Sequence, residues 1–400
     1  MQRTKRTALT VGIVGGCGHV GLPLALALSP HHRVRIYDID AETVERVRRG
    51  EMPFMDAGAD RALNEALTHG LEIGTETAIL KGCDVLLLVV GTPVDEHLNP
   101  SFSVFNRLLE QLYGVLEVGQ TLILRSTVYP GTSQRVLDEL RRRQLDVHVA
   151  FCPERVAEGL ALEEIRKLPQ IVSGFSVQGL EKAKAVFEPL GVDLIELTPA
   201  EAEMAKLFAN VHRYISFAVA NQFYMLASEA NLDLHRILKA MKYKYPRSAD
   251  LPGPGFTAGP CLFKDTMQMS AVNNNQFFLG HAAMLVNEGL PQFVVGRMKL
   301  RWPDLRERRI GLLGMAFKAE SDDARESLSY KLKKILALES AEVLTCDPYV
   351  SDPTLQTEGE VLRRADIFVI GAPHRRYREL DFQGKPVVDV WNHLGSGGLV

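Results

Sequence analysis

Cysteine is scarce and scattered in this sequence. The chain of 400 residues contains five cysteines, namely Cys17, Cys83, Cys152, Cys261 and Cys346. Their number is odd and no two of them form a C-x-x-C pair, so neither a disulfide framework nor a zinc site is indicated, and we expect no metal. A reducing compartment, the cytoplasm, is therefore the setting we expect.

Long apolar runs and an excess of one charge are also missing. Apolar runs such as VLLLVV at 85–90 fall far short of the roughly 20 residues that cross a bilayer. The 46 basic and 49 acidic side chains nearly balance, giving a net charge of -3. This balance provides no broad basic face for nucleic acid. We therefore expect small molecules or further copies of the chain as partners, and neither nucleic acid nor membrane.

What the sequence does contain is an alternation of short apolar runs with helical patterns. Runs rich in β-branched residues and bounded by turn residues are typical of buried parallel strands. In the first half they lie at 9–15, 33–38, 84–91, 120–127, 146–151 and 169–174. Helical stretches such as AETVERVRRG separate them, which predicts a doubly wound α/β sheet.

The middle of the chain has a different character. The segment 200–232 carries apolar residues at helical spacing without glycine or proline, which predicts one long helix or two joined ones. Its apolar residues are too many for one packing face, so other helices or another subunit must cover it. Four strand patterns return at 309–314, 342–347, 366–373 and 386–391. We therefore predict a first α/β domain at 1–198, a central helical dimerisation domain at 199–301 and a second α/β domain at 302–400.

The first strand runs directly into the motif GCGHVG at 16–21, and a helical pattern follows. In a dinucleotide fold the first glycine makes the tight turn, the second lets a pyrophosphate approach and the third lets helix pack on strand. Asp38 ends the second strand, where a carboxylate holds a ribose 2′-hydroxyl and repels a 2′-phosphate. The pattern predicts NAD rather than NADP, although Arg33 or Arg35 would blunt that selectivity. The alternative is a tight turn that binds nothing.

Two further segments follow strands at their carboxyl ends, where open α/β sheets bind ligands. They are VGTPVDE at 90–96 and RSTVYPGT at 125–132. Thr92, Pro93 and Thr127 are therefore candidates for the cofactor wall. Such residues also end strands for purely structural reasons.

Four more motifs carry chemically useful side chains. They are FCPERVAEG at 151–159, AEMAKLFAN at 202–210, GPCLFKD at 259–265 and GMAFKAESDDARES at 314–327. Together with GGCGHVGLPLA at 15–25, and in this order, they resemble the UDP-glucose/GDP-mannose dehydrogenase family of nucleotide-sugar 6-dehydrogenases. The resemblance runs almost from end to end.

The resemblance implies that the C6 alcohol of a nucleotide sugar is oxidised twice, with two NAD consumed, to a uronic acid. It also implies that Cys261 is the nucleophile. The thiolate adds to the intermediate aldehyde, a second oxidation gives a thioester, and water hydrolyses it. Small neighbours, Ala258 and Gly259, leave room for a substrate. The residues alone leave open whether Cys261 is instead one more buried thiol.

The resemblance also assigns the remaining catalytic roles. Lys206 and Asn210, four apart on one helical face, would stabilise negative charge on the C6 oxygen. Glu154 would move protons and activate the hydrolytic water, a task for which a buried carboxylate with a raised pKa is suited. Asp265 would orient Lys206 or a water, and Thr127 would assist. The alternatives are a solvated Lys206 and a Lys-Asp surface pair.

Motif and resemblance together predict two sets of contacts. The cofactor set is Gly16, Gly18, His19, Val20, Gly21, Asp38, Thr92, Pro93, Thr127, Glu158, Lys264 and Arg325. The substrate set is Glu154, Arg155, Lys206, Asn210, His212, Arg247, Phe256, Gly259, Phe317 and Lys318.

Some of these residues have competing interpretations. Arg325 suits a phosphate, but an interdomain salt bridge to Asp322 or Asp323 is the alternative. His212 either faces the sugar or packs in its helix. The cluster PHRRY at 373–377 reads as a solvated loop rather than a site.

The motifs disagree about the sugar. CPERVAEG and PGPG resemble enzymes of UDP-N-acetylhexosamines, whereas CLFKDT resembles those of UDP-glucose, and His19 and Ala258 depart from the family pattern. We favour a UDP-N-acetylhexosamine such as UDP-ManNAc, over UDP-glucose. The competing hypotheses are a two-electron β-hydroxyacid-type dehydrogenase and a non-catalytic nucleotide-binding homologue.

Overall fold

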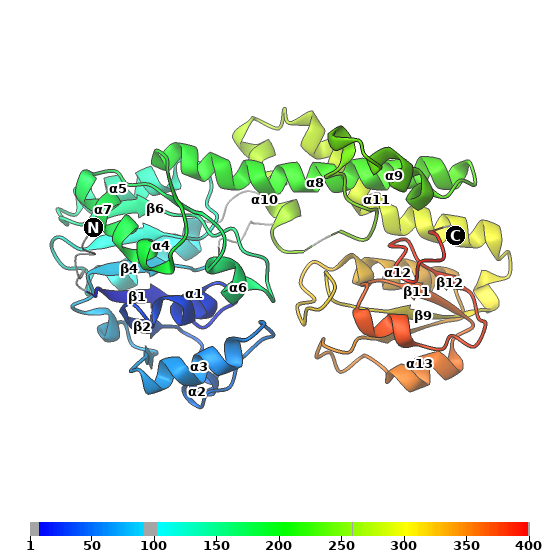
Figure 1. The fold of residues 1–400 in the computed structure, drawn as a ribbon, viewed down its shortest axis with the longest axis horizontal. Helices are drawn as coiled ribbons and strands as arrows, with labels where there is room; N and C mark the ends of the chain where they lie inside the picture. The colour runs from blue at the N-terminus through cyan, green and yellow to red at the C-terminus, as the bar shows by residue number, and fades with distance from the viewer. Residues whose placement is uncertain (1–7, 92–101, 258, 399–400) are drawn as a thin grey trace. The chain divides into compact units, whose positions relative to one another are not determined.

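The computed structural model describes residues 8–91, 102–257 and 259–398 (Figure 1). The chain divides into two compact units, Met1–Phe208 and Ala209–Val400. Helices and parallel strands alternate in both, so the predicted α/β fold class with two doubly wound sheets and long central helices is confirmed.

The first unit is built on a six-stranded parallel sheet with the order β3-β2-β1-β4-β5-β6. Its strands are β1 Thr10–Val14, β2 Arg33–Tyr37, β3 Glu72–Gly74, β4 Val85–Leu88, β5 Thr121–Leu124 and β6 His148–Phe151. The order reverses between β1 and β4, and ligands of such sheets bind at the carboxyl ends of the strands at this switch point. A separate pair of strands, β7 Gln170–Val172 and β8 Leu194–Glu196, takes up the run expected at 169–174.

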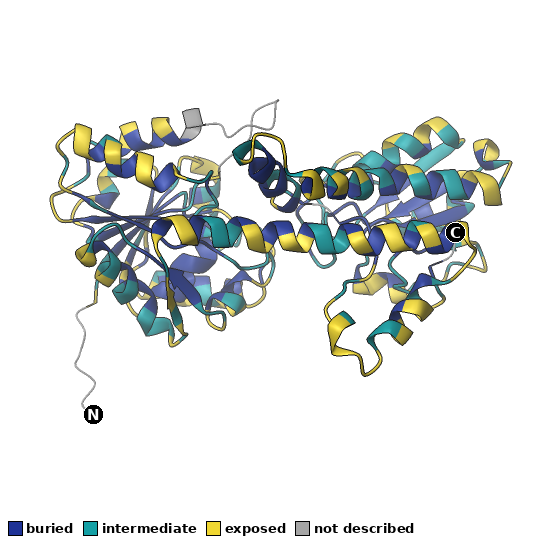
Figure 2. Ribbon diagram, turned by 90° about the horizontal axis from the view of Figure 1, so that it is seen from above, coloured by how far each residue is buried: buried dark blue, intermediate teal, exposed yellow. Residues whose placement is uncertain are grey.

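Helices cover both faces of this sheet because its central strands are buried on both faces, as β4 is at all four positions. Val85 and Leu87 pack into one core, and Leu86 and Leu88 pack into the other. This division follows from the period of two along a strand. The helices are α1 Gly21–Leu28, α2 Ala41–Arg48, α3 Ala59–Thr68, α4 Phe102–Leu112, α5 Thr132–Arg142, α6 Ala161–Ile165 and α7 Val177–Phe187. Figure 2 shows the buried strands inside and the exposed outer faces of the helices.

The second unit combines long helices with a smaller parallel sheet. Helix α8, Pro199–Glu229, is one continuous helix of 31 residues that begins in the first unit and ends in the second. The other helices are α9 Leu234–Lys242, α10 Leu262–Val272, α11 Phe278–Arg301, α12 Leu328–Glu339 and α13 Glu358–Arg364. In the described ranges, no helix is both long and apolar enough to cross a bilayer.

The sheet of the second unit has the order β10-β9-β11-β12. Its strands are β9 Arg309–Leu313, β10 Glu342–Cys346, β11 Ile367–Ile370 and β12 Val387–Val388. One face packs against α8, α9, α11 and α12 through residues such as Tyr224 and Leu332. Because β9 lies between β10 and β11, the loop that follows β9 opens at the switch point of this sheet.

Candidate active site

The glycine motif forms the turn between β1 and α1, but the tight turn is made by a different glycine from the one expected. Gly15, not Gly16, has the left-handed backbone, with φ +76°. A Cβ on Gly16 would lie 2.8 Å from Ile36, so packing alone requires glycine there. A Cβ on Gly21 would lie 2.6 Å from the Gly15 carbonyl oxygen, which confirms its role in helix packing. At Gly18 it would lie 3.9 Å from the same oxygen, leaving room for a phosphate.

Asp38 follows β2 and lies beside this turn. One carboxylate oxygen accepts from the Cys17 backbone N–H at 2.9 Å, and the other accepts from the Asp40 N–H at 3.1 Å. A cavity of about 470 Å³ is lined by Asp38, Gly18, Gly91 and Arg107, among others. An open glycine turn, a carboxylate and a cavity at the switch point fit the adenosine end of a dinucleotide. Arg107 on α4 was missed because it belongs to no motif.

The other predicted cofactor contacts of the first unit are placed as follows. His19 stacks on Phe54 with ring centroids 4.1 Å apart, and Val20 is the N-cap of α1. Thr127 and Glu158 are half-buried after β5 and β6. Thr92 and Pro93 lie outside the described residues. Arg35 donates to Glu72 and to the Lys81 carbonyl, so its guanidinium is already engaged and is not available to a 2′-phosphate.

Glu154 is buried, as expected, and its carboxylate is held by a buried arginine and by two backbone N–H groups. Its side chain is 8% exposed and pairs at 2.6 Å with Arg125, whose side chain is 0% exposed. Its second oxygen accepts from the backbone N–H groups of Arg155 and Val156, at 2.7 and 3.2 Å. Together these donors fix the position and orientation of the buried carboxylate.

Arg125 is therefore a site residue that the sequence interpretation missed. It directly follows β5 and also donates to the Cys152 carbonyl at 3.0 Å and to Gln170 at 2.8 Å. Its guanidinium lies 4.7 Å from the ring centroid of Phe187. The side chain thus ties the ends of β5 and β6 together around the Glu154 carboxylate.

In the second unit, Cys261 is the N-cap of α10. Of the five cysteines, all within the described residues, it alone is exposed. Burial raises the pKa of Cys17 and of Cys346 to about 12, and the pKa of Cys83 and of Cys152 to about 11. Those four stay protonated at neutral pH, whereas the helix N-terminus at Cys261 favours negative charge. The alternative of one more buried thiol is wrong.

Asp265 lies one turn into the same helix and is fully buried. It accepts from the side-chain amide of Asn210 on α8 at 2.6 Å, and Lys264 Nζ lies 3.8 Å from its other oxygen. This contact fixes Asn210, and the expected orientation of Lys206 or a water by Asp265 stays a prediction. Lys206 is half-buried one turn earlier on α8, in the first unit. A surface Lys-Asp pair is excluded for the buried Asp265.

The segment before Cys261 rests on the loop at 314–327, which we call the β9 loop. Gly259 has φ +111°, and a Cβ there would lie 2.6 Å from the Phe317 ring. Lys318 Nζ lies 5.9 Å from the centroid of the same ring. Arg325 pairs with Asp323 at 2.6 Å within the loop, so this salt bridge is local and not interdomain.

Exposure bears on the interpretation of four other residues. His212 is exposed, so it does not pack into the core through its helix. Arg247 is exposed, with its guanidinium 5.6 Å from the Tyr245 ring centroid. Phe256 is 2% exposed and packs edge-on against Trp391, so its ring anchors this segment. His374 is fully buried, and the prediction of a solvated loop at 373–377 is wrong for it.

Comparison with known proteins decides the family. The NAD binding, central and UDP binding domains of the UDP-glucose/GDP-mannose dehydrogenase family match residues 9–191, 200–288 and 311–396. A UDP-N-acetyl-D-mannosamine dehydrogenase of Pyrococcus horikoshii is 31% identical over 92% of this chain and 90% of its own length. The chain belongs to the UDP-glucose/GDP-mannose dehydrogenase family.

Other members of the family agree with this placement. An NDP-N-acetyl-D-galactosaminuronic acid dehydrogenase of Ralstonia nicotianae is 28% identical over 95% of both chains. The solved structure of UDP-D-ManNAc dehydrogenase from Pyrococcus horikoshii matches with a TM-score of 0.89 and 27% identity, covering 95% of both chains. The predicted resemblance, the NAD cofactor and the class of NAD-dependent nucleotide-sugar dehydrogenase are thereby confirmed. The roles assigned to individual site residues stay predictions.

Proposed function

We propose that this member of the UDP-glucose/GDP-mannose dehydrogenase family oxidises the C6 alcohol of a UDP-N-acetylhexosamine twice, to the uronic acid, with Cys261 as nucleophile. The observation that carries the proposal is the exposed Cys261 thiol at the first turn of α10, the helix that also carries the Asn210-bound Asp265. Bound NAD accepts a hydride in each of the two oxidations. The two-electron alternative explains neither this thiol nor the matching UDP binding domain.

Cys261 accounts for the steps between alcohol and acid. After the first oxidation the thiolate adds to the aldehyde carbon, forming a C–S bond and an oxyanion that takes up a proton. The second oxidation removes a proton and a hydride from this thiohemiacetal and leaves a thioester. Water then breaks the C–S bond, which releases the carboxylate and returns the thiol. Asn210, held by Asp265, provides an amide donor for the oxyanion.

Lys206, Glu154 and Thr127 keep the roles that the family resemblance gives them. For Glu154 the Arg125 pairing supports this role by holding the carboxylate in one place.

The motifs CPERVAEG and PGPG support a UDP-N-acetylhexosamine as the substrate. The manno isomer is supported by the relative from Pyrococcus horikoshii, which is named for UDP-N-acetyl-D-mannosamine. A panel of UDP- and GDP-sugars, with NADH counted per sugar, tests reaction and substrate together. We expect two NADH per UDP-ManNAc. One NADH per sugar would favour the two-electron alternative, and UDP binding without turnover would favour the non-catalytic homologue.

The role of the thiol is tested separately by Cys261→Ser. We expect loss of uronate production, with the enzyme arrested after the first oxidation or as an ester-linked adduct visible by intact mass. Full uronate production by this variant would remove the thiol from the mechanism.

We also propose a homodimer and a three-domain organisation, 1–198, 199–301 and 302–400. Val219, Phe223 and Leu226 are 37%, 36% and 55% exposed and recur at intervals of four and three along α8, which places them on one stripe. A second copy would cover this stripe. Light scattering of the wild type and of Leu226→Asp tests it, with a dimer and a weakened dimer as the expected results. A monomeric wild type would contradict the proposal.

A cytoplasmic location fits the same chemistry. All five cysteines lie in the described part of the chain and none is in a disulfide, and the proposed nucleophile requires a reduced thiol.

A further inference from the structure

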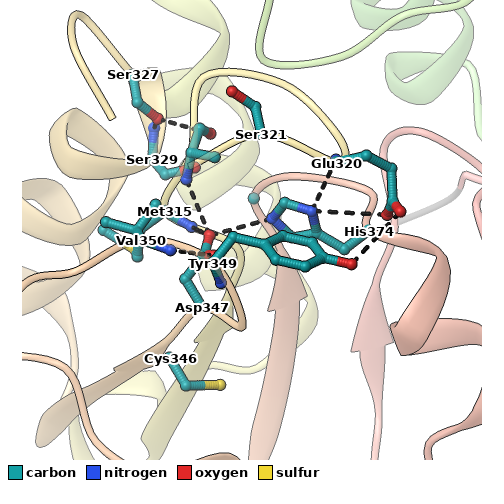
Figure 3. A network of polar contacts seen from close by, with 12 residues as sticks. Met315, Glu320, Ser321, Ser327, Ser329, Cys346, Asp347, Tyr349, Val350 and His374 are labelled. Atoms are coloured by element: carbon teal, nitrogen blue, oxygen red, sulfur yellow. Dashed lines mark hydrogen bonds and ion pairs between the residues drawn. The ribbon is translucent and has the colours of Figure 1, made fainter. Parts of the chain in front are cut away.

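Three loops meet at the carboxyl edge of the sheet in the second unit. The β9 loop carries Lys318 and Arg325, Asp347 follows β10, and His374 follows β11. Since β9 lies between β10 and β11, the β9 loop is flanked by the other two. The buried side chains of Asp347 and His374 bridge these loops (Figure 3). No motif pointed to Asp347, and the residues around His374 predicted a solvated loop.

Asp347 holds the start of the β9 loop. Its buried carboxylate accepts from the backbone N–H groups of Met315 and Ala316 at 2.6 and 3.0 Å. It also accepts from the N–H groups of Tyr349 and Val350, and from His374 Nε2 at 3.1 Å. Burial alone would raise the pKa of Asp347, but donation by His374 and by the backbone lowers it overall.

The position of Asp347 matches that of Asp38 in the first unit, since each follows the strand next to the first strand of its sheet. Asp38 is half-buried and lines a cavity, whereas the side chain of Asp347 is 0% exposed. The carboxylate that would meet a ribose in the first unit is used in the second to hold the loop.

His374 holds the middle of the loop, and its contacts define its protonation. Nδ1 lies 3.0 Å from the Glu320 backbone nitrogen, and Nε2 faces Asp347. A backbone N–H can only donate, so Nδ1 is the acceptor and the proton of the neutral ring is on Nε2. Tyr349 and Tyr377 meet the ring edge-on at centroid distances of 5.0 and 5.4 Å. The imidazole is thus fixed in one orientation and one tautomer.

Glu320 needs this support because its backbone is strained. Its φ is +52°, in the left-handed region that residues with a Cβ rarely adopt. Besides the His374 contact, its carboxylate accepts from the Arg375 N–H at 2.8 Å and from the Tyr349 hydroxyl at 3.4 Å. Lys318 lies two residues before this strained position, so a change of the backbone at Glu320 would displace Lys318 as well.

The same loop also supports the segment that leads to Cys261. The Phe317 ring lies 2.6 Å from the position of a Cβ on Gly259, and the Gly259 N–H donates to the Glu326 carbonyl at 3.5 Å. Glu326 has a positive φ as well, +53°. A shift of the β9 loop would therefore displace Lys318 and the Gly259 segment together.

We infer that Asp347 and His374 are positioning residues that hold the β9 loop in the conformation that binds the diphosphate of the nucleotide sugar. This inference rests on the proposed function. We do not place either residue in contact with the substrate. Both act by holding the loop that carries Lys318 and Arg325. A purely structural role would lower thermal stability alone, whereas positioning also weakens UDP binding and raises KM for the UDP-sugar without changing KM for NAD.

Three substitutions of His374 separate its two hydrogen bonds. His374→Phe keeps a flat ring between the tyrosines and removes both bonds. His374→Asn keeps an acceptor near Nδ1 for Glu320, and His374→Gln keeps a donor near Nε2 for Asp347. We expect His374→Phe to weaken UDP binding, measured by calorimetry, about 10- to 100-fold, the range for one hydrogen bond to a charged group. His374→Asn should restore most of the affinity and His374→Gln little of it.

His32 provides the matched control. It is also buried, and its two ring nitrogens contact the Leu9 N–H at 3.3 Å and the Val186 carbonyl at 3.0 Å, all within the first unit. His32→Phe should lower the thermal midpoint and leave UDP affinity unchanged. Equal weakening of UDP binding by His32→Phe would overturn the inference, because the loss would then be a general effect of stability.

The outcomes distinguish the inference from the function on which it rests. A wild type that binds no UDP would remove the proposed function itself. A wild type that binds UDP, together with a His374→Phe variant of the same affinity, would overturn the inference alone. If His374→Phe does not fold, the Asn and Gln variants decide, and UDP affinity equal to wild type in both would overturn it.

Discussion

Replacing Arg125 by methionine should destabilise the first unit strongly, and only while Glu154 is present. The Arg125 side chain is 0% exposed and donates to Glu154 at 2.6 Å and to Gln170 at 2.8 Å. Methionine has a similar unbranched stem and can pack on Phe187, over which the guanidinium now lies. The change therefore removes a charge and its donors while leaving little empty space.

The expected magnitude follows from the charge that is left behind. Removing one partner of a buried ion pair costs about 3–5 kcal/mol, because the other charge stays buried and uncompensated. The two backbone N–H groups that still bind Glu154 favour the lower end, about 3 kcal/mol. Removing both charges in Arg125→Met with Glu154→Leu should be close to neutral, since an apolar replacement of both partners often is. The two changes should thus be strongly non-additive, by at least about 3 kcal/mol.

Hydrogen exchange of the full chain, followed by mass spectrometry in peptides that contain β5 and β6, measures this locally. Local exchange is preferable because a chain of two units need not unfold in one transition. A loss of about 3 kcal/mol makes exchange through opening roughly 140-fold faster. Equal losses with and without Glu154 would refute the reasoning.

Three further predictions concern other parts of the molecule. Gly259→Ala should lower the free energy of unfolding by about 1–3 kcal/mol, because its backbone is left-handed and its Cβ clashes with Phe317, and it should lower turnover. The control is Gly253→Ala at an exposed position, where a Cβ meets no described atom within 4 Å. An equal drop in thermal midpoint for both variants would contradict the clash. Burial, and to a smaller extent the neighbouring His31, lower the pKa of His32 below its usual 6.5 despite the opposing Val186 carbonyl. As pH falls, His32 is therefore protonated in the unfolded chain at a higher pH than in the folded chain. The stability due to neutral His32 should therefore be complete above about pH 6.5 and decline below it; thermal midpoints of wild type and His32→Gln between pH 5 and pH 7.5 test this, and parallel profiles would contradict it. Asp38→Asn keeps an acceptor for Cys17 but removes the charge, so the preference for NAD over NADP in kcat/KM should fall about 10- to 100-fold; an unchanged ratio would show that another residue sets it.

The sequence predicted those parts of the fold whose structure depends on residues adjacent in the chain. Buried strands such as β1 and β4 are continuous apolar runs, so their pattern is visible locally. β3 and β8 were missed because each has three residues and exposed polar positions, and their pairing with β2 and β7 alone makes them strands.

The same distinction applies to the site. The glycine turn and Cys261 were identified because adjacent residues define them. The Arg125–Glu154 and Asn210–Asp265 pairs join segments 29 and 55 residues apart, and no local pattern contains such a pairing. His374 was misjudged because the exposed Arg375 and Arg376 beside it suggest a solvated loop, whereas its own ring is enclosed by Tyr349 and Tyr377.

The contrast between one exposed cysteine and four buried ones has a practical consequence. At neutral pH the buried sulfurs, with pKa values of about 11 to 12, are both shielded and protonated, so a maleimide added to the folded protein should label Cys261. One label per chain would then count intact catalytic centres in any preparation. The same accessibility makes Cys261 the sulfur most open to attack by peroxide, so storage under a reductant should preserve activity.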